Sequence, residues 1–241
     1  MAIAPFLAMT AAEMRNLSRI PQKCAWMACH FSPYGLGLSN LPQTLPSETL
    51  LMVDDITPPH GHDPQIVAAQ LQQCVDALEC SGILLDFQRP GNPETANLVK
   101  KLAAALACPV AVSEVYAEAV DCAAFLSPVP PSVPLQEHIA PWKGRDIWLD
   151  ISLSGEVIAV TEQGASVTAL PFPCTNKKGL PEETLHCHYW TELNEKNAVF
   201  TLWRTQEDLE NLLKEAEELG VTAAVGLYQE LHSFAAARSS T

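Results

Sequence analysis

The chain contains few basic residues and no long apolar run. Its 241 residues include 14 Lys and Arg against 28 Asp and Glu, which gives a formal net charge of -14 at pH 7. Nucleic acid and anionic membrane surfaces suit such a chain poorly because no basic patch is present. No uninterrupted apolar run approaches the roughly 20 residues of a membrane-spanning helix. We therefore expect a cytoplasmic protein whose partners include neither nucleic acid nor membranes.

Motifs of several common enzyme classes are also missing. The eight cysteines lack the close paired spacing of a zinc ribbon, and in a chain of this size they are typical of reduced, buried thiols. No glycine-rich phosphate loop follows the first predicted strand, and no G-x-S-x-G elbow is present. We expect no cofactor.

Length and composition favour one domain. With 48% hydrophobic residues, the chain can bury a substantial core and has the typical size of a single α/β barrel. Residues 2–9 are apolar, but no basic residue precedes them and Glu13 and Arg15 follow closely. Residues 1–22 are therefore predicted to form an arm or a helix of a single domain over 1–241, and not a signal peptide.

Strand-like and helix-like segments alternate along most of the chain. Asp63-Pro64 and Asn92-Pro93 each place a capping side chain before a proline, which is typical of a helix start. The alternation predicts a TIM-type (β/α) barrel, with an open doubly wound sheet as the alternative. Few elements precede residue 82, so we expect an early unit to be missing or distorted. Predicted strands cover 24–31, 50–53, 82–86, 110–112, 122–126, 147–151, 185–190, 199–203 and 223–228.

Two other segments complete the predicted architecture. Residues 156–161 and 166–170 alternate like two strands joined around Gln163-Gly164, which predicts a β-hairpin inserted into the barrel. Residues 205–219 are predicted to form a helix, since Thr205 and Asp208 provide a capped start and Gly220 a stop.

The run from Ser81 to Pro90, S-G-I-L-L-D-F-Q-R-P, carries the most informative motif. It resembles the fourth barrel strand of chitinase-like hydrolases of glycoside hydrolase family 18, which reads D-G-x-D-x-D-x-E followed closely by proline. The residues in register with that signature are Gly82, Asp86, Phe87 and Pro90.

Three carboxylates of the signature are replaced. Ser81 and Leu84 stand for the first two, and Gln88 stands where the resemblance places the proton-donating glutamate. An amide has no proton to give at neutral pH, so the resemblance implies that the usual acid is absent.

Polar side chains follow the ends of several predicted strands, and barrel active sites are built at that face. We expect Glu114 to be the substitute acid, because it follows the strand next to Asp86 and neighbouring carboxylates push their pKa values apart. Asp86 would then stabilise developing charge or orient an N-acetyl group, and Gln88 would bind the sugar. Further expected ligand contacts are Asp55, with Asp54 beside it, Asp150 and Glu230.

Aromatic side chains and histidines supply other candidates. Tyr34 and Trp190 border polar segments and could stack against sugar rings. By the same resemblance, Tyr228 takes the place of a tryptophan that floors the sugar site. The sequence leaves open whether a metal binds the remaining candidates, which are His60, His62, His186 and His188.

Three functions fit these observations. The first is a divergent barrel protein of the glycoside hydrolase superfamily that binds carbohydrate, with weak hydrolysis or with none. The second is a barrel enzyme for a small metabolite, with or without a metal. The third is an interaction scaffold without an active site. The expected partner is a carbohydrate or another small molecule.

Overall fold

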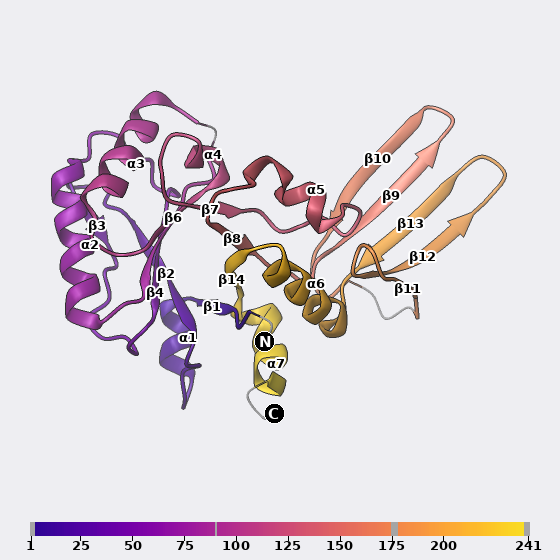
Figure 1. Ribbon diagram of the computed structural model, residues 1–241, viewed down its shortest axis with the longest axis horizontal. Coiled ribbons are helices and arrows are strands. Elements are labelled where there is room, and N and C mark those ends of the chain that lie inside the picture. Colours follow the sequence, from indigo (N-terminus) through magenta and orange to yellow (C-terminus); the bar gives the residue numbers. More distant parts are fainter. Residues whose placement is uncertain (1–2, 90, 175–177, 239–241) are drawn as a thin grey trace.

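The computed structural model describes residues 3–89, 91–174 and 178–238, and its main body is a closed barrel of eight parallel strands (Figure 1). Strand β1 pairs with both β14 and β2, which closes the ring. The predicted TIM-type barrel is thereby confirmed. Its strands are β1 Phe6–Met9, β2 Cys24–Phe31, β4 Leu50–Asp54, β5 Gly82–Asp86, β6 Val110–Ser113, β7 Ala123–Leu126, β8 Ile147–Asp150 and β14 Val221–Leu227.

The N-terminal segment supplies the first strand and first helix. Strand β1 is followed by α1 (Ala11–Asn16), which begins with a capping box between Thr10 and Glu13. Within the segment expected to form an arm or a helix, residues 6–9 thus form a barrel strand and only residues 11–16 are helical. The ring of strands is complete, so the irregularity that we expected in the early units lies in the helices.

Helical coverage of the barrel is uneven. Between β2 and β4 the chain forms only a loop with the two-residue strand β3 (Leu38–Ser39), which pairs antiparallel with β2. The predicted caps Asp63, Asn92 and Thr205 each accept a backbone hydrogen bond at a helix start. The remaining helices are α2 Pro64–Leu78, α3 Pro93–Ala105, α4 Glu114–Ala117, α5 Leu135–Ile139, the 3₁₀ helix η1 Ala140–Trp142, α6 Gln206–Glu218 and α7 Tyr228–Arg238.

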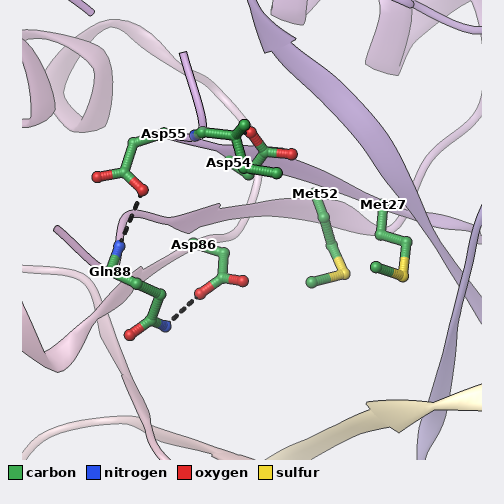
Figure 2. A pocket seen from close by; sticks show the side chains of 7 residues that line it. Met27, Met52, Asp54, Asp55, Asp86 and Gln88 are labelled. Carbon is green, nitrogen blue, oxygen red and sulfur yellow. Dashed lines mark hydrogen bonds between the residues drawn. The ribbon is translucent and has the colours of Figure 1, made fainter. Parts of the chain in front are cut away.

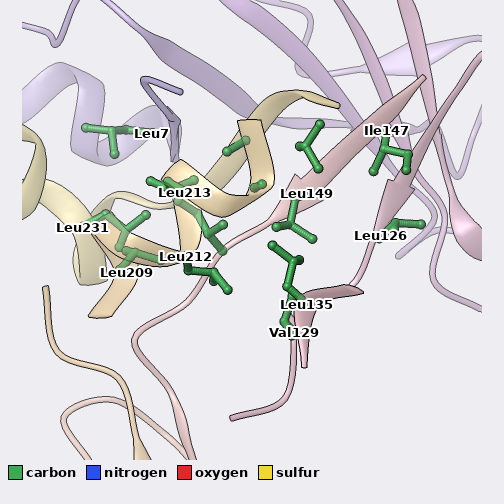
Figure 3. Packing of buried hydrophobic residues seen from close by; sticks show 14 of the residues in the cluster. Leu7, Leu126, Val129, Leu135, Ile147, Leu149, Leu209, Leu212, Leu213 and Leu231 are labelled. Carbon is green, nitrogen blue, oxygen red and sulfur yellow. The ribbon is translucent and has the colours of Figure 1, made fainter. Parts of the chain in front are cut away.

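Buried side chains form an interior layer and two outer layers. Alternate residues of the strands, such as Met52, Leu84 and Trp148, fill the barrel interior. The other face of each strand packs against helices; Figure 3 shows Leu149 of β8 in the same cluster as Leu212 of α6. All eight cysteines are free thiols. Among the described residues, no helix combines the length and apolarity needed to cross a membrane.

A five-stranded antiparallel sheet is inserted between β8 and α6, and its hairpins project away from the barrel (Figure 1). The predicted hairpin is present, but the insertion is larger than expected. The segments 185–190 and 199–203 were wrongly counted as barrel strands: a short turn joins them, and such a connection allows only antiparallel pairing. In spatial order the strands are β10 Gly164–Leu170, β9 Gly155–Thr161, β13 Ala198–Trp203, β12 Cys187–Leu193 and β11 Leu180–Glu182.

Candidate functional site

A pocket of about 210 Å³ opens at the carboxyl ends of β4 and β5, beside the middle of β2 (Figure 2). This is the face of the barrel on which the sequence predicted a site. Two kinds of side chain line the pocket, apolar ones from the barrel interior and polar ones from the strand ends. The lining residues are Met27, Met52, Asp54, Asp55, Ile56, Asp86 and Gln88.

Strand geometry explains which side chains enter the barrel mouth. Successive residues of a strand point to opposite faces, so the interior positions of Met52 and Leu84 place Asp54 and Asp86 on the inner face. These two aspartates are also register partners on neighbouring parallel strands. Two carboxylates thus lie side by side at the pocket, and β5 is the fourth strand of the barrel in chain order.

Asp86 and Gln88 are directly hydrogen-bonded, with the amide Nε2 of Gln88 donating to Oδ1 of Asp86 (Figure 2). Burial raises the pKa of the Asp86 carboxyl, and the negative charges of Asp55 and Asp54 raise it further. The hydrogen bond from Gln88 acts in the opposite direction, since it stabilises the ionised form. Gln88 therefore helps to keep a negative charge on Asp86.

Asp55 holds the backbone that carries Gln88. Its side chain is buried and accepts hydrogen bonds from the backbone N of Gln88 at 3.1 Å and of Arg89 at 3.0 Å. The Arg89 guanidinium in turn donates to the carbonyl oxygen of Ile56, which links the loops after β4 and β5. Asp55, expected as a ligand contact, thus also fixes the position of Gln88.

Asp54 lies in a partly desolvated position next to His30. Burial raises the pKa of the Asp54 carboxyl, whereas the backbone N of Ile56, at 3.0 Å from Oδ1, lowers it. The charge of His30 also lowers this pKa, and that of Asp55 raises it. His30 is the register partner of Asp54 on β2, which places an imidazole ring beside this carboxyl group.

Asp150 places another, partly buried carboxyl group at the barrel mouth, at the end of β8. Its neighbour Trp148 lies in the interior layer, and alternation turns Asp150 the same way. Burial raises the pKa of Asp150 to about 8, and the charge of Asp86 is the next largest cause. A hydrogen bond from the backbone of Ile151 opposes the shift, and Glu230 adds to it. Asp150 is therefore mainly protonated at neutral pH.

Glu230 and Glu114 both bind backbone groups near the strand ends. Glu230 lies in the first turn of α7 and accepts hydrogen bonds from the hydroxyl of Ser152 at 2.7 Å and the backbone N of Leu153 at 2.9 Å. Glu114 begins α4 and accepts a hydrogen bond from the backbone N of Ser127 at 3.3 Å. On β6 it is Ser113, and not Glu114, that follows the interior residue Ala111 by two positions. The structure thus gives Glu114 a partner at β7 and does not bring it to the pocket lining.

The three predicted aromatic contacts lie in different places. Tyr34 lies in the loop after β2 and is 97% exposed. Trp190 is on β12 of the inserted sheet, opposite Thr201. Tyr228 begins α7 and packs against the outer apolar cluster, whereas Leu227 continues the inward alternation of Ala223 and Val225.

The histidine pairs have hydrogen-bond partners of their own. His60 bonds Glu94 at 2.8 Å and His62 bonds the carbonyl oxygen of Ser32 at 3.0 Å. Across residues 3–89, 91–174 and 178–238, no three His, Cys, Asp or Glu side chains group as a metal site would require. The other two histidines bind carboxylates of α6 and so join the inserted sheet to that helix. His186 bonds Glu215 at 2.6 Å, and His188 bonds Asp208 at 2.8 Å.

Sequence reasoning missed part of the pocket. Met27, Met52 and Ile56 line it, but they are apolar and were not among the predicted contacts. Asp54 was named only as the neighbour of Asp55. The signal that could have identified Asp54 was the side-chain alternation within β4. Every second residue of a strand faces the same side, so Leu50, Met52 and Asp54 share the inner face.

No family model and no curated protein matches this chain. Solved structures do match across nearly its whole length. A chitinase-like agglutinin from Robinia pseudoacacia superposes with a TM-score of 0.62 at 13% identity, covering 98% of this chain and 99% of the other. A family 18 chitinase from Cycas revoluta, a mutant in complex with (GlcNAc)4, gives 0.63 at 12% identity, with 96% and 97% covered.

A third neighbour is a longer protein. The Bacillus cereus spore cortex-lytic enzyme SleL gives a TM-score of 0.54 at 12% identity, and the match covers 84% of this chain but only 63% of that enzyme. At these identities the similarity concerns the fold. The chain therefore has the barrel fold seen in chitinases, in a chitinase-like agglutinin and in a cortex-lytic enzyme.

Proposed function

We propose that the pocket at the barrel mouth binds a carbohydrate and that Asp86 and Gln88 are its main polar contacts. The observation that carries this proposal is the hydrogen-bonded Asp86–Gln88 pair, which lines a pocket on the fourth strand of a chitinase-like barrel. Sugar hydroxyls need both acceptors and donors, and a carboxylate beside an amide offers both. The pocket's apolar side, with Met27, Met52 and Ile56, suits the ring face of a saccharide.

Binding without efficient hydrolysis is the function that these side chains favour. Gln88 cannot donate an acid proton, and Glu114 already binds the backbone of Ser127. Two neighbours with the same fold support this proposal. One is an agglutinin, and the Cycas chitinase bound to (GlcNAc)4 carries a glutamate-to-glutamine substitution. We infer that this chain acts mainly as a binding protein.

Calorimetric titration with N-acetylglucosamine oligomers tests this proposal. Asp86→Ala should weaken binding roughly 10- to 100-fold, since a hydrogen bond to a charged group contributes about 1.5–3 kcal/mol. Glu118→Ala, which removes an exposed carboxylate of α4's C-cap, is the matched control and should bind like the wild type. Equal affinities for the wild type and Asp86→Ala would exclude this pocket as the glycan site.

A second variant separates binding from catalysis. Gln88→Glu restores a carboxyl group on a backbone that Asp55 already holds. It should release reducing ends from the oligomer faster than the wild type does, because a carboxylic acid can protonate the leaving oxygen. If Gln88→Glu binds the oligomer and is no faster than the wild type, the pocket does not orient the scissile bond.

A further inference from the structure

The inserted sheet has one long open edge. The barrel is closed and has no such edge, apart from the two-residue strand β3. At one side of the inserted sheet, strand β11 is only three residues long and contains Pro181 and Glu182, which are common protections against edge pairing. At the other side, β10 (Gly164–Leu170) presents seven residues, of which the first six are exposed.

Strand β10 lacks the features that normally protect an edge. It contains no charged residue and no proline, and it pairs with β9 in continuous register from Gly164 to Leu170, without a bulge. Backbone groups of alternate residues on an antiparallel edge strand point away from the sheet and stay unpaired. Within the described residues, β10 is thus the longest strand that offers free backbone donors and acceptors to another strand.

The sequence of β10 is nearly symmetric about Val167. Residues 165–169 read A-S-V-T-A, so antiparallel pairing with an identical strand, centred on Val167, places each residue opposite one of its own kind. Ala165 would face Ala169 of the second copy, and Ser166 would face Thr168. Side-chain alternation is preserved, since residues 165, 167 and 169 lie on one face in both copies.

The distribution of charge also favours a second copy of this chain as the partner of β10. The chain carries a net charge of -14, so two copies repel one another over most approaches, yet β10 carries none of that charge. The face that includes Val167 continues through Ile158, Val160 and Phe200 on the adjacent strands, and these are apolar as well. Apart from Glu156 of β9, which lies opposite Ala169 and bonds Ser132, this part of the face carries no charge. A charged partner would find no counter-charge on β10 itself, whereas a second copy supplies an equally uncharged edge strand.

The projecting part of the sheet also has little support of its own. From Ala159 to Ala169 no residue of the β9–β10 hairpin is fully buried, and Val167 is 58% exposed. Figure 1 shows the hairpins extending beyond α5 and α6. Sheets gain stability from additional strands, so extending this edge would stabilise the insertion.

We propose that this protein forms a two-fold symmetric dimer in which β10 of one copy pairs antiparallel with β10 of a second copy, giving a continuous ten-stranded sheet. Such an interface is isologous, since the same strand serves both subunits and the contact closes after two copies. The dimer does not depend on what the barrel mouth binds.

Charge-swap variants of Val167 test this geometry. In Val167→Lys and in Val167→Glu, like charges face each other at the two-fold axis, so each variant alone should be a monomer of 26.2 kDa. A mixture of the two variants should restore a species of twice that mass, because lysine then faces glutamate. Mass is measured by analytical ultracentrifugation, and circular dichroism verifies folding, which substitution at this exposed position leaves intact.

Leu193→Lys is the matched control. It also replaces an exposed aliphatic side chain of the inserted sheet, but on β12, away from the β10 edge. The proposal requires the wild type and Leu193→Lys to be dimers. A wild-type mass of 26.2 kDa at all concentrations would overturn it, as would dimers that persist in both single Val167 variants or fail to return in the mixture.

Discussion

Replacing Asp150 by asparagine should change how the stability of the protein depends on pH. Desolvation raises the pKa of the partly buried Asp150 carboxyl from its ordinary value of 3.8 to about 8. Between these two values the folded protein holds a proton that the unfolded chain has released. Stability therefore falls as pH rises through this window, and the loss is complete once the pH exceeds the folded pKa.

The structure sets the magnitude of this effect. One proton difference corresponds to a slope of about 1.4 kcal/mol per pH unit in the free energy of unfolding. Over the whole shift, from 3.8 to about 8, the cost of ionising Asp150 is on the order of 6 kcal/mol. Asparagine has nearly the same shape and carries no charge, so Asp150→Asn should lack this slope and become the more stable protein at high pH.

The assay is guanidinium unfolding of both proteins at closely spaced pH values from about 5 to about 10, which spans the folded pKa. The difference in free energy of unfolding, variant minus wild type, should grow with pH and level off above about 8. Glu118→Gln, at an exposed carboxylate, controls for the loss of one negative charge. Parallel curves for the wild type and Asp150→Asn would mean that Asp150 is ionised in the folded protein, and the reasoning would be refuted.

Three further substitutions test individual parts of the scaffold by denaturant unfolding. Asp55→Asn should destabilise the protein by about 1–3 kcal/mol, because an amide accepts poorly from two backbone N–H groups, and an unchanged midpoint would contradict that role. Gly82→Ala should cost about 1–3 kcal/mol, since its Cβ would lie 2.7 Å from the carbonyl oxygen of Pro109; a neutral effect would show that β5 and β6 can separate. Thr205→Ala should cost about 1 kcal/mol through loss of the α6 cap, and a change below a few tenths would argue against the capping box.

The sequence predicts the barrel because its local signals agree with one another. Caps such as Asp63 and Asn92 mark helix starts, and apolar runs between them mark strands. The sequence did not predict strand β1 because residues 7–9 are all buried. A fully buried run has no alternation of polar and apolar residues that would distinguish a strand from a helix. The strands at 185–190 and 199–203 were recognised but misplaced, since a strand's sequence does not specify its neighbours.

The pocket lies at the face of the barrel where the sequence predicts a site, but its lining differs from the predicted residues at several strand ends. Each difference concerns the phase of the side-chain alternation, that is, which alternate residues of a strand face the barrel interior. Asp55 was ranked above Asp54, although Asp54 is the residue that follows interior Met52 by two positions. The same rule selects Ser113 over Glu114 on β6.

The phase could not be fixed from the sequence, because a strand buried on both faces is apolar at every position. On β5, residues 83–85 are all fully buried, so nothing distinguishes the inner face from the outer one. The phase appears only where the strand leaves the core and polar residues begin, and there a single-residue error moves a side chain to the opposite face. Asp86 and Gln88 escaped this ambiguity because they lie two residues apart, and whichever face is inner, both side chains share it. The Asp86–Gln88 pair was therefore the one part of the pocket whose internal geometry could be deduced before its surroundings were known.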